Sequence, residues 1–183
     1  MKLLCNKQSV YDAVINVSKA VSERCVMPSL EGIKLKLENS ILELTGYDLE
    51  IGIRTVITVN SDDRGEFILN ARLLSEMIKK MPDENIFIEV NDNMQVTLSS
   101  GVTTYNITAL AADEYPELPG KDSSEEISVP QTTLKSMINQ TIFAVSQSDI
   151  KPILKGELFE IENGMFNLVA IDGYRLAVRS ESI

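Results

Sequence analysis

The sequence predicts an α+β fold of repeated β-α-β-β-β units, with helices on one face of antiparallel sheets. Three observations support this prediction. The same order of patterns occurs three times, in copies that open at Lys2, Glu66 and Glu126. Each copy places an amphipathic helical stretch after a short apolar strand, and segments of alternating apolar and polar residues follow. Such a repeat is one supersecondary unit, which buries its apolar face only against a neighbouring copy.

The first copy begins with a strand at residues 2–6. Ser9, with Asp12 three residues later, matches a capping box and predicts a helix from Ser9 to about Val21. The outward side chains of this helix are Asp12, Asn16 and Lys19. Further strands are expected at residues 32–38, 41–46 and 49–59. In the first of them Ile33, Leu35 and Leu37 share one face, while Lys34, Lys36 and Glu38 share the other.

The second copy repeats this order from a strand at residues 66–70. Its helix covers residues 71–81 and ends before Pro82. One arc of this helix is apolar, with Leu73, Leu74, Met77, Ile78 and Met81. The opposite side carries Arg72, Glu76, Lys79 and Lys80. Strands are expected at residues 85–90, 94–99 and 102–110, with a hairpin turn at Asn91–Asn93.

A connector rich in proline and acidic residues precedes the third copy. We therefore expect one domain at residues 1–118, a linker at 119–125 and a second domain at 126–183 that holds a single copy. The third copy is expected to have a strand at 126–130, a helix from Gln131 to Val145 and strands at 153–162, 165–171 and 175–181. Its helix turns polar side chains outward, namely Thr132, Lys135, Ser136, Asn139 and Gln140.

The composition is that of an ordinary globular protein, with 44% hydrophobic and 24% charged residues. No apolar run reaches the roughly 18 residues that a membrane span needs. The first residues do not resemble a signal peptide, so Cys5 and Cys25 are expected to be reduced thiols in a cytoplasm. Half of the net charge of −10 falls in residues 111–126, so a local basic surface elsewhere is compatible with the acidic whole.

Residues that carry chemistry are scarce. The chain has no histidine, which is the commonest general base and metal ligand. It has no glycine-rich phosphate loop and no cysteine cluster with metal-binding spacing. We expect no catalytic residue, no metal and no cofactor, and an enzyme is the most distant of the possible functions.

Two segments are candidate binding sites on residue type alone. Arg24 follows the first helix in an irregular segment, either as a solvated arginine or as a phosphate contact. The second is the hairpin AIDGYRLAV, in which Asp172-Gly173 predicts a two-residue turn. It is either a plain hairpin or one side of a shallow apolar groove with Leu154, Ile171 and Leu176 as walls. Tyr174 and Arg175 would supply its polar contacts, and such a groove suits an extended peptide.

Four segments together resemble one family, the bacterial sliding clamp, which is the beta subunit of DNA polymerase III. They are the segment MPSLEGIKL, the segment LELTGYDLEIGI, the strand YNITAL leading to DEYPELP, and GELFEIENGMFNLVAIDGYRLAVRS. The resemblance covers the whole chain. It implies the DNA-clamp fold and a homodimeric ring of six domains whose helices line a hole for duplex DNA. It also implies a non-catalytic processivity factor that tethers the replicative polymerase, with this chain as an N-terminal portion.

The resemblance also implies roles for individual residues. Arg24, Ser148, Pro152 and Ile153 match positions that contact DNA, and cations on the helices add a sequence-independent attraction to phosphate. These cations are Lys19, Arg72, Lys79, Lys80 and Lys135. The half of a peptide groove that binds linear motifs of polymerase and clamp loader is matched by Leu154, Ile171, Gly173, Tyr174, Arg175 and Leu176. Tyr105 and Ile107 match the edge that meets the second clamp chain.

One alternative of a different class stays open at this point. A stand-alone half-clamp could act as a protein-interaction module that captures clamp-binding partners without encircling DNA. In isolation the module would be stably folded and bind motif peptide, whereas a fragment of a ring would expose an unpaired sheet edge and self-associate.

Overall fold

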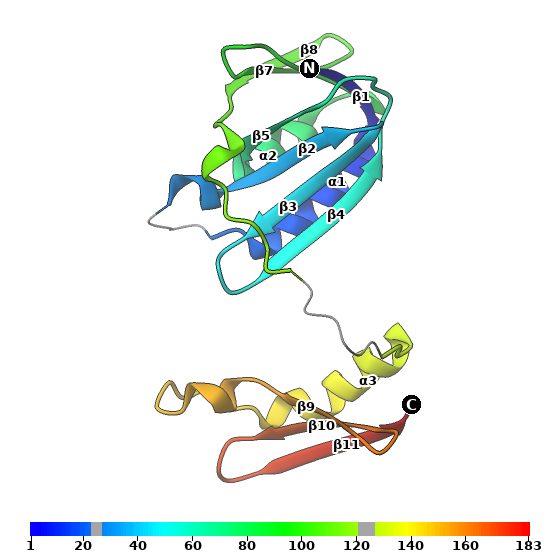
Figure 1. Ribbon diagram of the computed structural model, residues 1–183, viewed down its shortest axis with the longest axis vertical. Helices are drawn as coiled ribbons and strands as arrows, with labels where there is room; N and C mark the ends of the chain where they lie inside the picture. Colours follow the sequence, from blue (N-terminus) through cyan, green and yellow to red (C-terminus); the bar gives the residue numbers. More distant parts are fainter. Residues whose placement is uncertain (23–26, 121–126) are drawn as a thin grey trace. The chain divides into compact units, whose positions relative to one another are not determined.

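The computed structural model describes residues 1–22, 27–120 and 127–183. The chain folds into two compact units, Met1–Gly120 (unit 1) and Lys121–Ile183 (unit 2), and Figure 1 draws both. Unit 1 contains the first two copies of the repeat, and unit 2 contains the third. The α+β class is confirmed.

Unit 1 contains two copies with the same order of elements. The first copy has β1 (Lys2–Asn6), α1 (Lys7–Val17), the 3₁₀ helices η1 (Ser18–Ala20) and η2 (Pro28–Glu31), β2 (Gly32–Glu38), β3 (Ile41–Tyr47) and β4 (Gly52–Thr58). The second copy has β5 (Gly65–Asn70), α2 (Ala71–Lys80), β6 (Asn85–Val90), β7 (Gln95–Ser100), β8 (Thr103–Thr108) and the 3₁₀ helix η3 (Ala112–Glu114).

The two copies exchange their opening strands. The sheets of unit 1 have the orders β4-β3-β2-β5 and β1-β6-β7-β8, and every pairing in them is antiparallel. Thus β1 of the first copy pairs with β6 of the second, and β5 of the second pairs with β2 of the first. Each sheet is therefore complete only when both copies are present. The sequence pattern did not predict this exchange.

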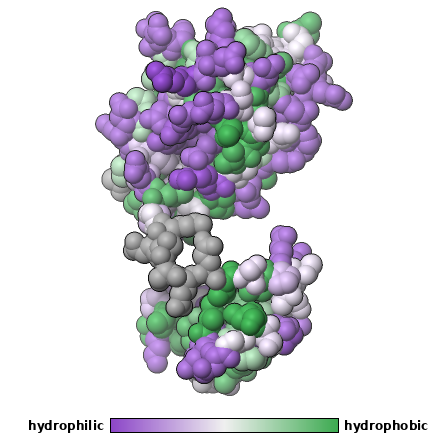
Figure 2. Space-filling model, turned by 45° about the vertical axis from the view of Figure 1, so that its right-hand side comes forward, coloured by the Kyte–Doolittle hydropathy of each residue, from purple (hydrophilic) through white to green (hydrophobic). Residues whose placement is uncertain are grey.

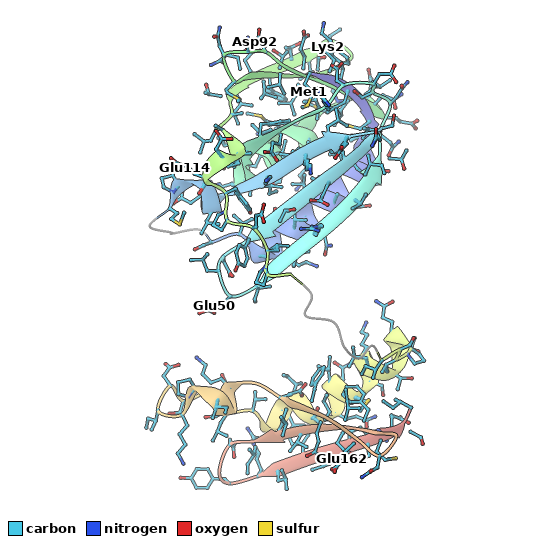
Figure 3. All side chains as sticks on the ribbon, viewed as in Figure 1. Met1, Lys2, Glu50, Asp92, Glu114 and Glu162 are labelled. Atoms are coloured by element: carbon cyan, nitrogen blue, oxygen red, sulfur yellow. The ribbon has the colours of Figure 1, made fainter. Side chains whose placement is uncertain are left out.

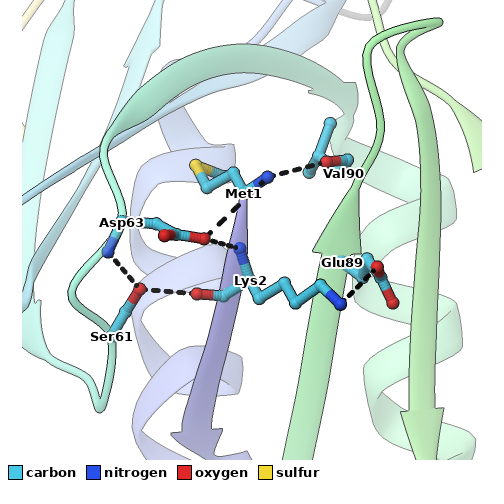
Figure 4. A network of polar contacts seen from close by, with 6 residues as sticks. All are labelled: Met1, Lys2, Ser61, Asp63, Glu89 and Val90. Carbon is cyan, nitrogen blue, oxygen red and sulfur yellow. Dashed lines mark hydrogen bonds and ion pairs between the residues drawn. The ribbon is translucent and has the colours of Figure 1, made fainter.

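A network of polar contacts holds the start of β1 in place (Figure 4). The Lys2 ammonium lies 2.9 Å from the Glu89 carboxylate on β6, and the Met1 nitrogen donates to the Val90 carbonyl at 2.9 Å. On the other side, the backbone N–H of Lys2 donates to Asp63 at 2.7 Å, and the Ser61 hydroxyl donates to the Lys2 carbonyl at 2.5 Å. The opening strand of the first copy is thus tied to the second copy at its first residues.

One hydrophobic core joins α1, α2 and both sheets of unit 1. Figure 1 shows α1 and α2 behind the sheet β4-β3-β2-β5, and the two helices contact each other. The alternation predicted for residues 32–38 is confirmed, because Ile33, Leu35 and Leu37 are buried. A Cβ atom on Gly46 in β3 would lie only 2.1 Å from the Val17 carbonyl oxygen, so a glycine is needed where α1 crosses this strand.

An asparagine side chain caps the first turn of each helix in unit 1. The capping box predicted at Ser9 and Asp12 is therefore wrong. α1 begins at Lys7, because the Asn6 side chain accepts from the Ser9 N–H, and Asp12 instead accepts from the Gln8 amide at 2.8 Å. Asn70 caps α2 in the same way, by accepting from the Leu73 N–H at 3.1 Å. The last asparagine of each opening strand thus satisfies an N–H group that has no partner within the helix.

Other details of unit 1 also differ from the expectation. The strand predicted at 49–59 is β4 (Gly52–Thr58), because Asp48 accepts from the N–H groups of Glu50 and Ile51 and turns the chain there. Figure 3 labels Glu50 in this turn. On α2 the apolar arc is narrower than predicted, since Leu73 is 45% exposed while Leu74 and Ile78 are fully buried.

Unit 2 is one helix against a three-stranded sheet of order β11-β10-β9. Its elements are α3 (Gln131–Thr141), the 3₁₀ helices η4 (Ile142–Ala144) and η5 (Pro152–Lys155), β9 (Leu158–Glu162), β10 (Met165–Ile171) and β11 (Leu176–Ser182). The helix predicted to reach Val145 therefore ends in a 3₁₀ turn. The strand predicted from residue 153 begins only at Leu158, because Pro152 opens η5.

The opening strand predicted for the third copy is wrong over its described residues. Residues 127–130 belong to no strand, and Pro130 stands where Asn6 and Asn70 cap the other helices, without a side-chain cap. In unit 1 each opening strand pairs with the sheet of the other copy. A segment without a strand to pair with gains no ladder hydrogen bonds, so the third copy on its own lacks this element.

Cys5 lies in β1 with its side chain buried in the unit 1 core, and burial raises the pKa of Cys5 to about 12. Cys25 lies outside the described residues. Among the described residues, no helix is long and apolar enough to cross a membrane.

Candidate functional site

An apolar patch lies on the face of the unit 2 sheet that points away from α3. Along β10 the side chains of Phe166, Leu168 and Ala170 are buried, and the residues between them lie on the opposite face. Pairing across β9, β10 and β11 places five apolar residues of that face together. This outer patch consists of Leu158, Val169, Ile171, Leu176 and Val178.

Two predicted groove residues form one end of this outer patch. Ile171 and Leu176 are direct cross-strand partners at the end of the β10–β11 ladder, and they are 40% and 62% exposed. Side chains of such pairs contact each other. Figure 2 shows apolar surface gathered on unit 2, whereas polar side chains dominate the visible face of unit 1. An exposed patch of this kind is typical of a binding surface.

The loop between β10 and β11 has four residues, Asp172–Arg175, and not the two-residue turn that was predicted. Asp172 organises it: one carboxylate oxygen accepts from the N–H groups of Tyr174 and Arg175 at 2.9 and 3.0 Å. The other oxygen accepts from the Arg175 guanidinium at 2.8 Å. Gly173 has a φ of +92°, a conformation that side chains disfavour.

These contacts set the electrostatics of the loop. The N–H group of Tyr174, with that of Arg175 and its guanidinium, holds the pKa of Asp172 below its usual range. The Arg175 guanidinium also lies 5.8 Å from the centre of the Phe143 ring, within the range of a cation–π contact. Arg175 is thus held between Asp172 and Phe143, while the Tyr174 side chain is fully exposed.

Leu154 is connected to this region through the backbone. Its carbonyl accepts from the Ser146 N–H at 2.8 Å, and Val145, the residue before Ser146, packs with Ala170 and Ala177. Leu154 itself is half-buried. The structure therefore brings Ile171, Gly173, Tyr174, Arg175 and Leu176 together in one hairpin and attaches Leu154 to the adjoining segment.

A second candidate site is the outward surface of the helices. Lys19, Arg72, Lys79, Lys80 and Lys135 are all exposed. Exposed positions of α1, η1, α2 and α3 carry these five cations and two carboxylates, Asp12 and Glu76. Arg72 is partly neutralised, because its guanidinium lies 3.2 Å from Glu76. A hollow of about 460 Å³ between the end of α1 and the start of α2 includes Arg72.

Three more of the predicted DNA-contacting residues lie between α3 and β9. Ser148 is exposed, and its hydroxyl accepts from the Ile150 N–H at 3.3 Å. Pro152 opens η5, and the Ile153 side chain is 87% exposed. Arg24, the remaining predicted contact, lies outside the described residues.

Tyr105 and Ile107 lie on β8, which is an edge strand of its sheet. Both are half-buried and pack against the unit 1 core, whereas their neighbours Thr104 and Asn106 are exposed. An edge strand presents unpaired backbone N–H and carbonyl groups, which is the chemistry that a pairing strand requires.

Sequence reasoning missed several residues of the outer patch and its loop. Leu158, Val169 and Val178 could have been found, because the runs LF, LVAI and LAV are apolar at consecutive positions, a pattern of strands covered on both faces. The role of Asp172 in ordering the loop and the contact of Phe143 with Arg175 required the structure. Among the described residues, no group of three or more metal-binding side chains occurs.

Known proteins are similar to this chain in sequence and in fold. The model of the DNA polymerase III beta subunit, N-terminal domain, matches residues 1–119, and the model of its central domain matches residues 128–183. The beta sliding clamp of Halalkalibacterium halodurans is 38% identical over an alignment of 187 positions, which covers 98% of this chain and 49% of that protein. The beta sliding clamp of Bacillus subtilis is 36% identical, over 100% of this chain and 50% of that protein.

The crystal structure of the DNA polymerase sliding clamp from Bacillus subtilis matches all of this chain with a TM-score of 0.95, and the match covers 50% of that chain. The chain thus spans about half the length of the relatives it matches. The fold is that of the DNA clamps, as the sequence resemblance implied. Since the two family models together cover residues 1–119 and 128–183, the chain belongs to the DNA polymerase III beta subunit family.

Proposed function

We propose that the chain works as part of a sliding clamp, a processivity factor that encircles duplex DNA and tethers the replicative polymerase. The observation that supports this most is the match of both units to sliding clamps in sequence and fold, over the full length of the chain. The clamp would be a non-catalytic accessory subunit that acts in the cytoplasm, on DNA of the nucleoid. It would need no cofactor.

The helices are the surface that we assign to DNA. Their exposed positions carry more cations than carboxylates although the whole chain has a net charge of −10. Lysine and arginine side chains neutralise phosphates without reading the base sequence, which leaves a clamp able to slide. Arg24, Ser148, Pro152 and Ile153 are proposed as further contacts. In a complete ring, Tyr105 and Ile107 on β8 would meet a second clamp chain.

The outer patch and its loop are the surface that we assign to protein partners. Ile171 and Leu176 would take apolar side chains of a linear motif from polymerase or clamp loader, with Leu154 beside them. Tyr174 and Arg175 would supply polar contacts, and Gly173 leaves the backbone of the loop accessible. An extended peptide gains affinity from a few anchoring side chains of this kind.

A second candidate function is a half-clamp that binds partner motifs without encircling DNA. The observation that favours it is the location of all six proposed groove residues in unit 2. It differs from the first candidate in predicting peptide binding but no retention on DNA.

Titration calorimetry of the 183-residue chain with a motif peptide from a replicative polymerase tests the groove that both functions share. We expect Leu176→Ala to weaken binding about tenfold or more, because it removes an exposed apolar anchor. Met165→Ala is the matched control, since Met165 lies at the other end of the same face. Equal affinity of the wild type and Leu176→Ala would contradict the assignment.

A further inference from the structure

We propose that Phe143 is a positioning residue of the peptide groove, whose ring, together with Asp172, holds the Arg175 guanidinium in place before a partner binds. The free N–H groups of this guanidinium then donate to a backbone carbonyl of the bound motif. The inference rests on the groove proposed above, and it adds to that groove a residue that does not line it.

Phe143 is fixed beside the end of the unit 2 sheet. It lies in η4, and the next residue, Ala144, is fully buried. Ala144 packs with Ala170 of β10, whose cross-strand partner is Ala177 of β11. This alanine pair is one position from the end of the β10–β11 ladder, where the loop that carries Arg175 begins. The backbone of Phe143 is therefore anchored next to that loop.

The ring of Phe143 approaches Arg175 from the helix side of the sheet. Successive residues of a strand point to opposite faces, so Ala170 and Ile171 lie on different sides of β10. η4 packs on the Ala170 side, whereas Ile171 and Leu176 belong to the outer patch. Phe143 thus does not extend the row of apolar anchors, and its contact with the groove is through Arg175.

Two contacts hold different parts of the Arg175 side chain. Its Nε donates to the Asp172 carboxylate at 2.8 Å, and its Cζ lies 5.8 Å from the centre of the Phe143 ring. The Asp172 side chain is only 16% exposed, and two N–H groups of the loop donate to it. An arginine that is held in this way before binding loses less conformational freedom when the partner arrives.

The same contacts leave part of the guanidinium available for a partner. Among the described residues, only the Nε of Arg175 has an acceptor, and the side chain is 53% exposed. The N–H donors on the terminal nitrogens are therefore free. Asp172 is ionised, because the neighbouring N–H groups hold its pKa below the usual range, so the Arg175–Asp172 pair has no net charge. Free donors on a neutral pair suit a neutral acceptor, such as a main-chain carbonyl of an extended peptide.

Titration calorimetry of the chain with the motif peptide tests the role of the ring. Phe143→Leu should weaken binding about two- to fivefold, which corresponds to one exposed cation–π contact. Phe143→Trp should keep the wild-type affinity or raise it, because tryptophan is the best aromatic partner of a cation. The matched control is Phe159→Leu, since Phe159 is also half exposed but packs against Phe166. Equal affinity of Phe143→Leu and the wild type would overturn the proposal.

A double-mutant cycle shows whether the ring acts through Arg175. In an Arg175→Ala background, Phe143→Leu should have no further effect on the affinity, because there is no guanidinium left to hold. An equal loss of affinity in both backgrounds would mean that the ring contacts the peptide itself. That result would refute the positioning role.

The identity of the acceptor is tested on the peptide. Changing its acidic side chains to the corresponding amides should leave the effect of Phe143→Leu unchanged, because the backbone carbonyl is still present. Replacing the contacted peptide bond by an ester, whose carbonyl is a weaker acceptor, should reduce that effect. If the amide peptide abolishes the effect instead, Arg175 binds a carboxylate and the assignment of a carbonyl is wrong.

An NMR spectrum of the arginine Nε–H groups in the free chain separates this inference from the groove itself. The Arg175 signal, assigned by its loss in Arg175→Lys, should be shifted to low frequency by the ring current of Phe143, and Phe143→Leu should remove the shift. A shift in a chain that binds no motif peptide would refute the groove and confirm the position of Arg175. A wild-type signal without the shift would overturn the inference even if the peptide binds.

Discussion

At the scale of single residues, one glycine inside a strand is fixed by a close contact with the backbone of a helix. Gly46 lies in β3, directly beneath the C-terminal end of α1. A glycine inside a strand normally makes the strand less stable than a β-branched residue would. Its presence therefore indicates that another backbone segment approaches closely. The 2.1 Å between a Cβ at this position and the Val17 carbonyl oxygen gives the reason.

Gly46→Ala should therefore lower the free energy of unfolding of unit 1 by about 3 kcal/mol, the upper range for overpacking a core. The clashing atom belongs to the backbone of α1, which cannot move as a flexible side chain would. Thermal unfolding followed by circular dichroism checks this prediction. The control is Gly120→Ala, where a Cβ would meet no atom within 4 Å. An equal effect of the two variants would disprove the close approach.

The residues that start the helices show where sequence reasoning reached its limit. Asn6 and Asn70 both stand between an apolar strand and a helix, and asparagine is a favoured cap. Ser9 and Asp12 also match a capping box in the local sequence. Only the contacts in the structure show that Asn6, and not Ser9, caps the helix. Asp172 is similar: its Asp-Gly pair predicted a turn, but the four-residue loop results from three hydrogen bonds to one carboxylate.

At the scale of elements, the strands and helices of unit 1 followed from the periodicity of the sequence. β2 alternates as predicted, and α2 begins and ends within one residue of the expected bounds. The periodicity did not predict which strands pair with one another. Alternation shows which side of a strand is buried, but it carries no information on which strand lies next to it, so the exchange of β1 and β5 required the structure.

The α2 helix is the element whose proposed contact with DNA is most accessible to experiment. We expect Lys79→Glu/Lys80→Glu to weaken binding of the chain to duplex DNA. The double variant should also lower the slope of log affinity against log salt by about 1 to 2, since each lost phosphate contact lowers it by about 0.9. Fluorescence anisotropy with a labelled duplex at several salt concentrations measures both effects.

The control for this experiment is Lys36→Glu/Arg64→Glu, which makes the same change in total charge on a strand and a loop outside the helices. A similar loss of affinity in both double variants would mean that net charge alone is responsible. In that event the helical face would not be the surface that meets DNA.

At the scale of the whole molecule, the repeat organises the fold, and it explains why unit 1 and unit 2 differ in what they expose. Two copies complete each other in unit 1, whereas in unit 2 β9 pairs only with β10 among the described residues, and Ile127 is 47% exposed. The odd number of copies was visible in the sequence. What an unpaired copy would expose was not, because that depends on the exchange of strands between copies.

The most direct test of the clamp function is topological. A chimera would carry this chain in place of the matching half of the Bacillus subtilis clamp, to which it is 36% identical. Once sedimentation shows an assembled ring, the chimera is loaded on a nicked circular plasmid and washed at high salt. The clamp account predicts retention on the circle and release when the plasmid is linearised. An assembled chimera that is not retained, or that stays bound to linear DNA, would contradict it.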